Sequence, residues 1–281
     1  MDNFELLSRA SGFLVRKSDR SGVHIVTSAH VVHPFAFPGY YPLEEHAWLR
    51  FVNEDHVQTK FEIREREGGR VVFCRNLGDK VYRHETRDVC VVHPEDPTEF
   101  LQAIAEFDKG TQEHILELED DEVCVCMYLW PCIGPCLCCA SDQVDVCGCE
   151  CVGNQAVKSA VAGKDDVMFV GHEIIEASGE LQEQLPCVVP GTLLGQTPQG
   201  QMFASTQSTL KMGMCGGPVI NGRGKCIGAV EGIVPETGPE PLRLCAAVIA
   251  ADTVATLLRE VEALRESEQG SEAFGGRGLP T

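Results

Sequence analysis

The sequence contains no apolar run of the ~20 residues that a membrane-spanning helix needs. Its first residues, Met-Asp-Asn-Phe-Glu, are acidic and lack the apolar stretch of a secretory signal peptide. Cationic side chains are few, since 23 Lys and Arg residues stand against 42 Asp and Glu residues and leave a net charge of −19. Because a phosphate backbone attracts positive charge, this balance argues against a nucleic-acid partner. We therefore expect a cytoplasmic protein with no membrane span and no nucleic-acid partner.

Aromatic residues are scarce at 6%, whereas 28 glycines and 15 cysteines are many for a chain of 281 residues. A chain of this length with 43% apolar residues can bury a large core in one or two domains. The many glycines suit an all-β protein with frequent turns. In a reducing cytoplasm the cysteines are expected to be thiols or metal ligands, because disulfide frameworks belong to oxidising compartments. Their odd number also excludes complete pairing within the chain.

Short apolar or alternating segments separated by turns predict β-strands in two parts of the chain. The expected strands are 11–15, the run that begins at Val23, 47–53, 60–66, 70–74, 88–92 and 115–119, and then 167–174, 187–194, 201–206, 218–220, 226–234 and 242–249. Helical spacing predicts a short helix at 97–107 and an amphipathic helix at 252–266. The apolar face expected for the second helix consists of Val254, Leu257, Leu258, Val261 and Leu264.

Two short motifs carry the chemistry. The hexapeptide Gly-Met-Cys-Gly-Gly-Pro at 213–218 predicts a tight turn that projects the thiol of Cys215 and leaves backbone N–H groups free to converge on one point. A nucleophile beside such donors is what acyl transfer needs. Far upstream, an apolar strand ends in Thr-Ser-Ala-His, which places His30 at a strand end. An imidazole is well suited to act as a general base near neutral pH.

These motifs resemble those of the trypsin/chymotrypsin-like proteases, including their HtrA-type relatives. Thr-x-Ala-His and Gly-x-Ser-Gly-Gly-Pro are the histidine and nucleophile motifs of that superfamily, and here Cys215 stands where most members have serine. The cysteine also gives a resemblance to the viral 3C-type cysteine proteases, whose nucleophile motif is Gly-x-Cys-Gly-Gly. The third motif, an aspartate that opens a short apolar strand, is matched by Asp88. The resemblance covers roughly residues 8–266 and keeps the order His, Asp, nucleophile.

The resemblance implies an all-β fold of two six-stranded antiparallel β-barrels followed by a C-terminal helix. The expected parts are an N-terminal barrel at 8–120, a Cys-rich inter-barrel insertion at 121–160, a C-terminal barrel with the helix at 161–266, and a disordered tail at 267–281. In this fold the catalytic groups meet in the cleft between the barrels. His30 and Asp88 would then come from the first barrel and Cys215 from the second.

The implied activity is that of an intracellular endopeptidase that hydrolyses protein or peptide substrates and needs no cofactor or metal. His30 would activate Cys215 as part of a thiolate–imidazolium pair, Asp88 would orient the imidazole, and the N–H groups of Gly213 and Cys215 would form the oxyanion hole. Candidate substrate-pocket residues are Thr209, Val230 and Glu231. The alternative is an inactive member of the same fold that serves as a binding module, since cysteine in a serine-tuned site can mark lost activity.

Nine of the fifteen cysteines lie at 123–152. Their soft thiolates at close spacing are compatible with zinc or Cu(I), although the spacings do not form paired Cys-x2-Cys knuckles. The same segment is equally open to interpretation as a dispensable insertion, as a retained intron because Val-Cys-Val-Cys resembles translated GT repeats, or as a site of lipidation or redox chemistry. Other histidines are expected at surface or packing positions, among them His24, His33, His84 and His172.

Overall fold

The structure is a computed structural model. The residues that it describes are 6–16, 23–41, 43–64, 71–77, 80–94, 98, 102, 115–117, 124–126, 166–175, 183–197, 199 and 201–275. Apart from residues 98 and 102, the predicted helix at 97–107 lies outside these residues, as does most of the predicted insertion. Among the helices of the described ranges, none combines the length and the apolar character needed to cross a bilayer.

Strands dominate both halves of the chain. In the N-terminal half they are β1 Gly12–Arg16, β2 Val23–Thr27, β3 Lys60–Arg64, β4 Val71–Asn76, β5 Val81–Arg83, β6 Cys90–Val92, β7 Ile115–Glu117 and β8 Cys124–Cys126. In the C-terminal half they are β9 Asp166–Ile175, β10 Glu183–Gln196, β11 Gln201–Thr206, β12 Pro218–Asn221, β13 Cys226–Ile233 and β14 Ala246–Ala250. The helices are α1 Ala29–Val32, η1 Pro34–Ala36, η2 Pro38–Tyr40, α2 Leu43–His46, η3 Ala47–Phe51, η4 Glu54–His56 and α5 Ala251–Gly275.

The six strands of the C-terminal half form a closed antiparallel barrel in the order β10-β11-β14-β13-β12-β9. Register shifts interrupt three of its strand pairs, and such bulges bend strands enough to help a small barrel close. Inward-facing side chains fill the interior, with Phe169, Val219 and Val248 fully buried. Closure gives every strand of this ring two neighbouring strands, which makes the barrel a firm frame for the loops that connect its strands.

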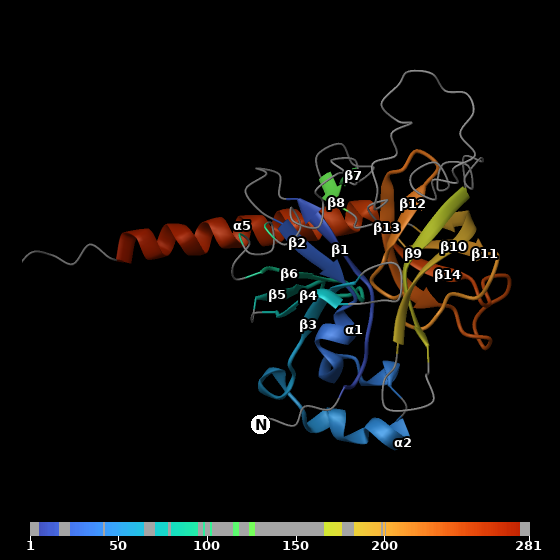
Figure 1. Cartoon of the computed structure of the whole chain (residues 1–281), viewed down its shortest axis with the longest axis horizontal. Helices are drawn as coiled ribbons and strands as arrows, with labels where there is room; N and C mark the ends of the chain where they lie inside the picture. The colour runs from blue at the N-terminus through green and yellow to red at the C-terminus, as the bar shows by residue number, and fades with distance from the viewer. Residues whose placement is uncertain are drawn as a thin grey trace, which may run out of the picture.

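The N-terminal half is built differently. Among the described residues, its strands form a six-stranded sheet in the order β5-β6-β2-β1-β8-β7, and β3 and β4 make a separate hairpin. In Figure 1 this sheet lies beside the closed barrel, with α1 and α2 below it. Closure of this half into a second barrel therefore stays a prediction.

The C-terminal helix α5 packs against both halves. Its apolar face shares one buried cluster with Phe13 of β1, Val26 of β2 and Ile249 of β14. The buried residues of this face are Val254, Leu257, Leu258 and Val261, as the helical spacing predicts. Leu264 is 54% exposed, so the expectation that it belongs to this face is wrong. Figure 1 shows that the far end of α5 extends beyond the rest of the fold.

Helix α5 continues to Gly275, so the segment predicted as a disordered tail from 267 onwards begins as helix. Between Ser267 and Gly275 the sequence contains Ser, Glu, Gln and Ala together with Gly270 and Gly275. The apolar spacing that predicts the helix ends before the helix does. An apolar face is required for packing but not for extending a helix into solvent.

The expected strand at 47–53 is wrong. This segment is the 3-10 helix η3, in which only Leu49 is buried, while Trp48 and Phe51 are 47% and 81% exposed. The backbone here closes locally, with the Val52 N–H donating to the Leu49 carbonyl at 3.2 Å. A strand needs a neighbour to satisfy its backbone groups, and the apolar pattern alone does not supply one.

The segment expected as an inter-barrel insertion at 121–160 contains a strand near its start. Strand β8, Cys124–Cys126, pairs with β1 and with β7, so it completes the N-terminal sheet between them. Its Cys-Val-Cys sequence is compatible with a strand because cysteine behaves as a small apolar residue. Seven of the nine clustered cysteines lie outside the described residues, so the alternatives for the segment that follows β8 remain hypotheses.

Candidate active site

His30 and Asp88 are brought together by strand pairing. In β2 and β6, Thr27 faces Cys90, which places the residues after β2 beside those before β6. Asp88 Oδ1 accepts the backbone N–H of His30 at 2.7 Å, and Asp88 Oδ2 lies 2.5 Å from His30 Nδ1. Because a carboxylate accepts at Nδ1, the proton belongs on Nδ1 and the lone pair is left on Nε2. The carboxyl group is 2% exposed and the imidazole 12%, so water competes little for this pair.

Two tyrosines hold the segment that carries His30. The Tyr41 hydroxyl donates to the His30 carbonyl at 2.8 Å. The ring of Tyr40 stacks on the imidazole, with the ring centres 4.4 Å apart and the planes within 10° of parallel. Burial raises the pKa of the Tyr40 hydroxyl, and the charges of Asp88, Glu231 and Cys215 raise it further. Tyr40 is therefore neutral at physiological pH and lies close to all three of these groups.

The turn that carries Cys215 depends on its glycines. Gly213 has φ +94°, and a Cβ there would meet the His172 carbonyl at 2.7 Å. Gly216 has φ +79°, and a Cβ there would meet the Ser28 N at 2.6 Å. Any other residue would be strained at both positions and would push the turn away from its neighbours. Since Ser28 precedes His30 by two residues, the Cys215 turn packs directly on the segment that carries His30.

The backbone N–H groups of this turn divide into two sets. Those of Met214, Gly216 and Gly217 donate to carbonyls, and Gly216 N–H binds the Val230 carbonyl of β13 at 2.8 Å. Those of Gly213 and Cys215 donate to no backbone carbonyl among the described residues. The Met214 side chain is 1% exposed and belongs to the barrel core, which anchors the turn. The two unused donors are the pair expected from the sequence to hold an oxyanion.

Ser11, just before β1, ties this turn to the N-terminal half. Its N–H donates to the Cys215 carbonyl at 3.0 Å, and its hydroxyl donates to the Gly213 carbonyl at 2.7 Å. Its own carbonyl accepts the Thr27 hydroxyl at 2.7 Å, and its Oγ accepts the His172 N–H of β9 at 2.8 Å. Ser11 is 3% exposed, so these bonds are shielded from water. One residue thus joins the strand that leads to His30 with the loop that carries Cys215.

The thiol of Cys215 is not poised as a thiolate. Burial raises its pKa to about 11, and the charge of Asp88 adds to that rise. With this pKa the sulfur carries its proton near neutral pH, and the expected thiolate–imidazolium pair stays a prediction. A protonated thiol, like a serine hydroxyl, needs a base to remove its proton as it attacks a carbonyl carbon.

The three substrate-pocket candidates have different surroundings. Thr209 is exposed in the loop before the Cys215 turn. Val230 is 1% exposed in the barrel core, so it meets the turn through its backbone and not through its side chain. Glu231 is half-buried at the bulge of β13, and its Oε2 accepts the Gln201 side-chain N–H at 2.5 Å. Among the three candidates, Glu231 and Thr209 are the side chains left to contact a substrate.

Sequence reasoning missed Ser11, Tyr40 and Tyr41 as parts of the site. Ser11 was visible only as the residue before a strand, although a small polar residue followed by Gly12 does indicate a close backbone approach. The tyrosines lie ten and eleven residues after His30, and no periodic pattern connects them with it. Their roles come from contacts that the sequence pattern does not encode.

No protein-family profile and no curated protein matches this chain. Among solved structures, a serine endoprotease from Yersinia pestis is similar at 14% identity and a TM-score of 0.44, over 92% of this chain and 60% of its own. Deg5 is similar at 16% identity and a TM-score of 0.43, over 90% of this chain and 82% of its own. The MamO protease domain from Magnetospirillum magneticum is similar at 13% identity and a TM-score of 0.40, over 90% of each chain. This chain spans 60% of the length of the Yersinia protein, and likenesses of this level do not by themselves assign a family.

Proposed function

We propose that this protein is a peptidase of the trypsin/chymotrypsin-like kind with a Cys-His-Asp triad formed by Cys215, His30 and Asp88. The observation that carries the proposal is the Asp88–His30 pair, held against the Cys215 turn by the Ser11 N–H bond to the Cys215 carbonyl. Nucleophile, base and orienting acid are the three parts that acyl transfer by such a triad requires.

The proposed reaction begins when His30 Nε2 takes the thiol proton as the sulfur of Cys215 attacks the carbonyl carbon of a peptide bond. The negative charge moves to the carbonyl oxygen, where the N–H groups of Gly213 and Cys215 stabilise it; one such donor is worth ~3 kcal/mol of barrier. The C–N bond then breaks, and the imidazolium returns its proton to the leaving amine. Water, activated by the same imidazole, hydrolyses the thioester and restores the thiol.

A peptide in extended form suits the proposed site. Strand β13 pairs with β12 only as far as Ala229, whereas its other edge continues to pair with β14 through Ile233. The edge beyond Val230, next to the Cys215 turn, has no strand neighbour among the described residues. An extended peptide can bind such an edge by main-chain hydrogen bonds. Because the nucleophile must remain a free thiol, a reducing compartment such as the cytoplasm stays the expected location.

A binding module without catalysis is the second candidate. The observation that favours it is the raised pKa of Cys215, about 11, which leaves the sulfur protonated and weak as a nucleophile unless His30 assists it. In that case the same β13 edge would hold peptides without cleaving them.

The decisive experiment measures hydrolysis of a peptide library by the wild type, by Cys215→Ala, by His30→Ala and by the double variant. Each single change should remove nearly all activity, and the double variant should be no worse than either, because the two residues act as a unit. Cys74→Ala and His56→Ala, both at exposed positions, are matched controls. Peptides that bind to the wild type but are never cleaved would favour the binding module instead.

The pH dependence of Cys215 alkylation separates the two chemical states of the thiol. With a pKa of about 11, the rate of reaction with iodoacetamide should keep rising between about pH 7 and 10, since only the thiolate reacts. A plateau already reached near neutral pH would contradict this and restore the preformed ion pair.

A further inference from the structure

A cavity of about 370 Å³ lies between the two halves of the molecule. Its walls come from β1 and β2, from the β3–β4 hairpin, and from β9 and β10 of the closed barrel. None of His30, Asp88 and Cys215 lines it, so it is distinct from the proposed active site. The volume lies within the range of small-molecule sites, which occur preferentially at domain interfaces.

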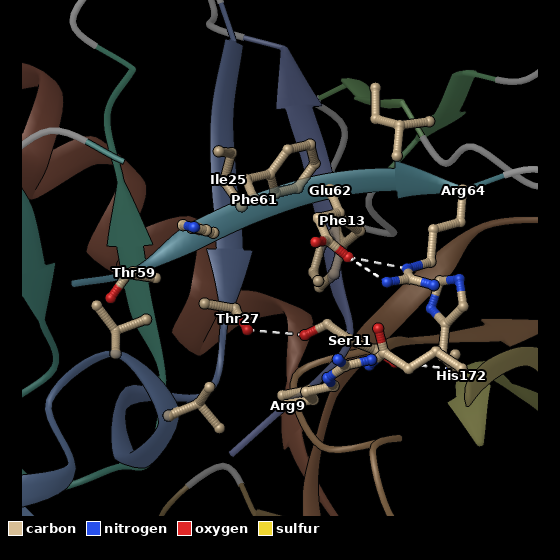
Figure 2. Close-up of a pocket in the computed structure, with 18 of the residues that line it drawn as sticks. Arg9, Ser11, Phe13, Ile25, Thr27, Thr59, Phe61, Glu62, Arg64 and His172 are labelled. Carbon is tan, nitrogen blue, oxygen red and sulfur yellow. Dashed lines mark hydrogen bonds and ion pairs between the residues drawn. The ribbon is translucent and has the colours of Figure 1, made fainter. Parts of the chain in front are cut away.

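The floor of the cavity is apolar. Leu14 and Ile25 belong to the buried core of the N-terminal half, and Phe61 of β3 and Leu77, both half-buried, pack against that core. Figure 2 shows Phe61 and Ile25 close together on one side of the pocket. Together these side chains offer a surface for an apolar group.

The opposite end of the cavity is polar and carries an excess of positive charge. Among the described lining residues, three cations face one anion, Arg9, Lys60 and Arg64 against Glu62. This excess is notable in a chain whose net charge is −19. The Arg64 side chain is only 14% exposed, and its Nε and Nη2 donate to Glu62 Oε2 at 2.9 and 2.5 Å.

The charge of Arg64 reaches across the cavity to His172 of β9. Burial lowers the pKa of the His172 imidazole, and the guanidinium of Arg64 lowers it further. Figure 2 shows the His172 ring beside the Arg64 side chain, with Arg9 and Ser11 nearby. An anion placed here would be stabilised by the positive charges of the neighbouring side chains.

We propose that this cavity binds a small monocarboxylate with a compact apolar body, and that its occupancy acts on the Cys215 turn through Ser11. The carboxylate lies at the end formed by Arg64, Arg9 and His172. The apolar body lies on the floor formed by Ile25 and Phe61. The charge of the carboxylate suits the cationic end of the cavity, and the apolar body suits the apolar floor. An inorganic anion would suit only the first, and a hydrocarbon only the second.

Ser11 links the cavity wall to the nucleophile. Its Oγ accepts the His172 N–H on the cavity side and donates to the Gly213 carbonyl on the turn side. A ligand that orders His172 and Ser11 also orders the peptide groups that hold the Cys215 turn. The link consists of hydrogen bonds between buried groups. Because a hydrogen bond tolerates only a limited range of distances and angles, a shift of one partner moves the other.

The binding part is tested by calorimetric titration of the full chain with 4-phenylbutyrate, and with 4-phenylbutanol as the uncharged control. Saturable one-to-one binding of the acid, about tenfold or more tighter than that of the alcohol, is expected. Arg64→Gln should weaken binding about tenfold, whereas Glu62→Gln should tighten it about threefold. Both variants break the same ion pair, so a purely structural effect would move them in the same direction. Absence of binding, equal binding of acid and alcohol, or parallel shifts in the two variants would overturn the site.

The link to Cys215 is tested by the rate of its alkylation with iodoacetamide, followed by peptide mapping so that the other cysteines do not interfere. Saturating 4-phenylbutyrate should change this rate about threefold or more in the wild type, and Ser11→Ala should abolish the change while leaving the acid bound. An unchanged rate in the wild type, or an equal change in Ser11→Ala, would overturn the link. Neither measurement requires peptidase activity, so both remain informative if the proposed function fails.

Discussion

The closed C-terminal barrel and the six-stranded sheet of the N-terminal half differ in how far their own strands support them. In the barrel, every strand has two neighbours, and the core anchors Met214 directly beside Cys215. In the N-terminal half, β5, β6, β7 and β8 are three residues long, and residues of β1, β2 and β6 share a buried cluster with α5. Cys215 therefore stands on a closed barrel. His30 and Asp88 stand on a sheet whose core is shared with the C-terminal helix.

The helix α5 supplies much of that support. Its buried residues Leu258 and Val261 pack in one cluster with side chains of β1, β2 and β6 as well as with Ile249 of the barrel. A sheet of short strands buries little core of its own, so the core that it shares with α5 stabilises it. Although both halves consist of antiparallel strands, the N-terminal sheet depends more on packing against the rest of the molecule than the barrel does.

The largest effect is expected at Asp88, in the N-terminal half. Asp88→Asn should keep the fold, because the amide oxygen can still accept the His30 N–H. The change removes the carboxylate that orients the imidazole and stabilises its positive charge. The rate of peptide hydrolysis should fall by less than the ~10⁴ seen for a serine triad, because a thiol needs this third group less. Asp55→Asn, at an exposed position, is the control. Full activity of Asp88→Asn would show that another carboxylate, or none, serves as the third member.

The dependence of the N-terminal sheet on α5 is tested by Leu258→Ala. Leu258 is 3% exposed, so the change should lower the free energy of unfolding by about 3 kcal/mol, and Leu264→Ala, at a 54% exposed position on the same helix, by less than about 0.5 kcal/mol. In hydrogen exchange, the amides of β1 and β2 should lose more protection than those of β11. Equal loss in both halves would mean that the barrel is as dependent on α5 as the sheet is.

A smaller effect is expected at the joint between the halves. Ser11→Ala removes the hydroxyl that binds the Gly213 carbonyl and leaves the His172 N–H without its acceptor. The kcat of peptide hydrolysis should fall about tenfold with little change in KM, since the loss of one buried hydrogen bond costs about 1–3 kcal/mol and acts on the turn, not on substrate contacts. Ser205→Ala on the barrel surface is the control. A rise in KM at constant kcat would contradict this positioning role.

No effect is expected from the segment between the halves, once β8 is kept. Replacing 127–152 with a short Gly/Ser linker should leave the melting temperature and the alkylation of Cys215 unchanged, because loop closure costs rise slowly with length. Replacing 123–152 should lower the melting temperature, because it removes the strand that pairs with β1 and β7. Bound zinc in the purified wild type, with a large loss of stability in chelator, would instead favour the metal-site hypothesis.

Much of the fold could be predicted where local pattern and tertiary role agree. Residues 201–206 were expected as a strand and form β11 with the same bounds. At 47–53 the apolar pattern resembled a strand, yet no strand of the described residues pairs with it, and Ala47–Phe51 is a 3-10 helix. The pattern records which residues can be buried. It does not record whether a partner is there to bury them.

The sequence by itself determined the Cys215 turn and the strand end at His30, because both depend on residue types that act locally: glycines that tolerate positive φ, and an apolar strand that ends in a polar residue. Only the tertiary structure decided that Asp88, among several nearby carboxylates, lies against His30, because this depends on the register in which Thr27 faces Cys90. It also decided the roles of Ser11 and Tyr40 and the existence of the cavity. These arise from contacts between segments far apart in the chain, and such contacts are set by how two unlike halves pack together, not by any one stretch of sequence.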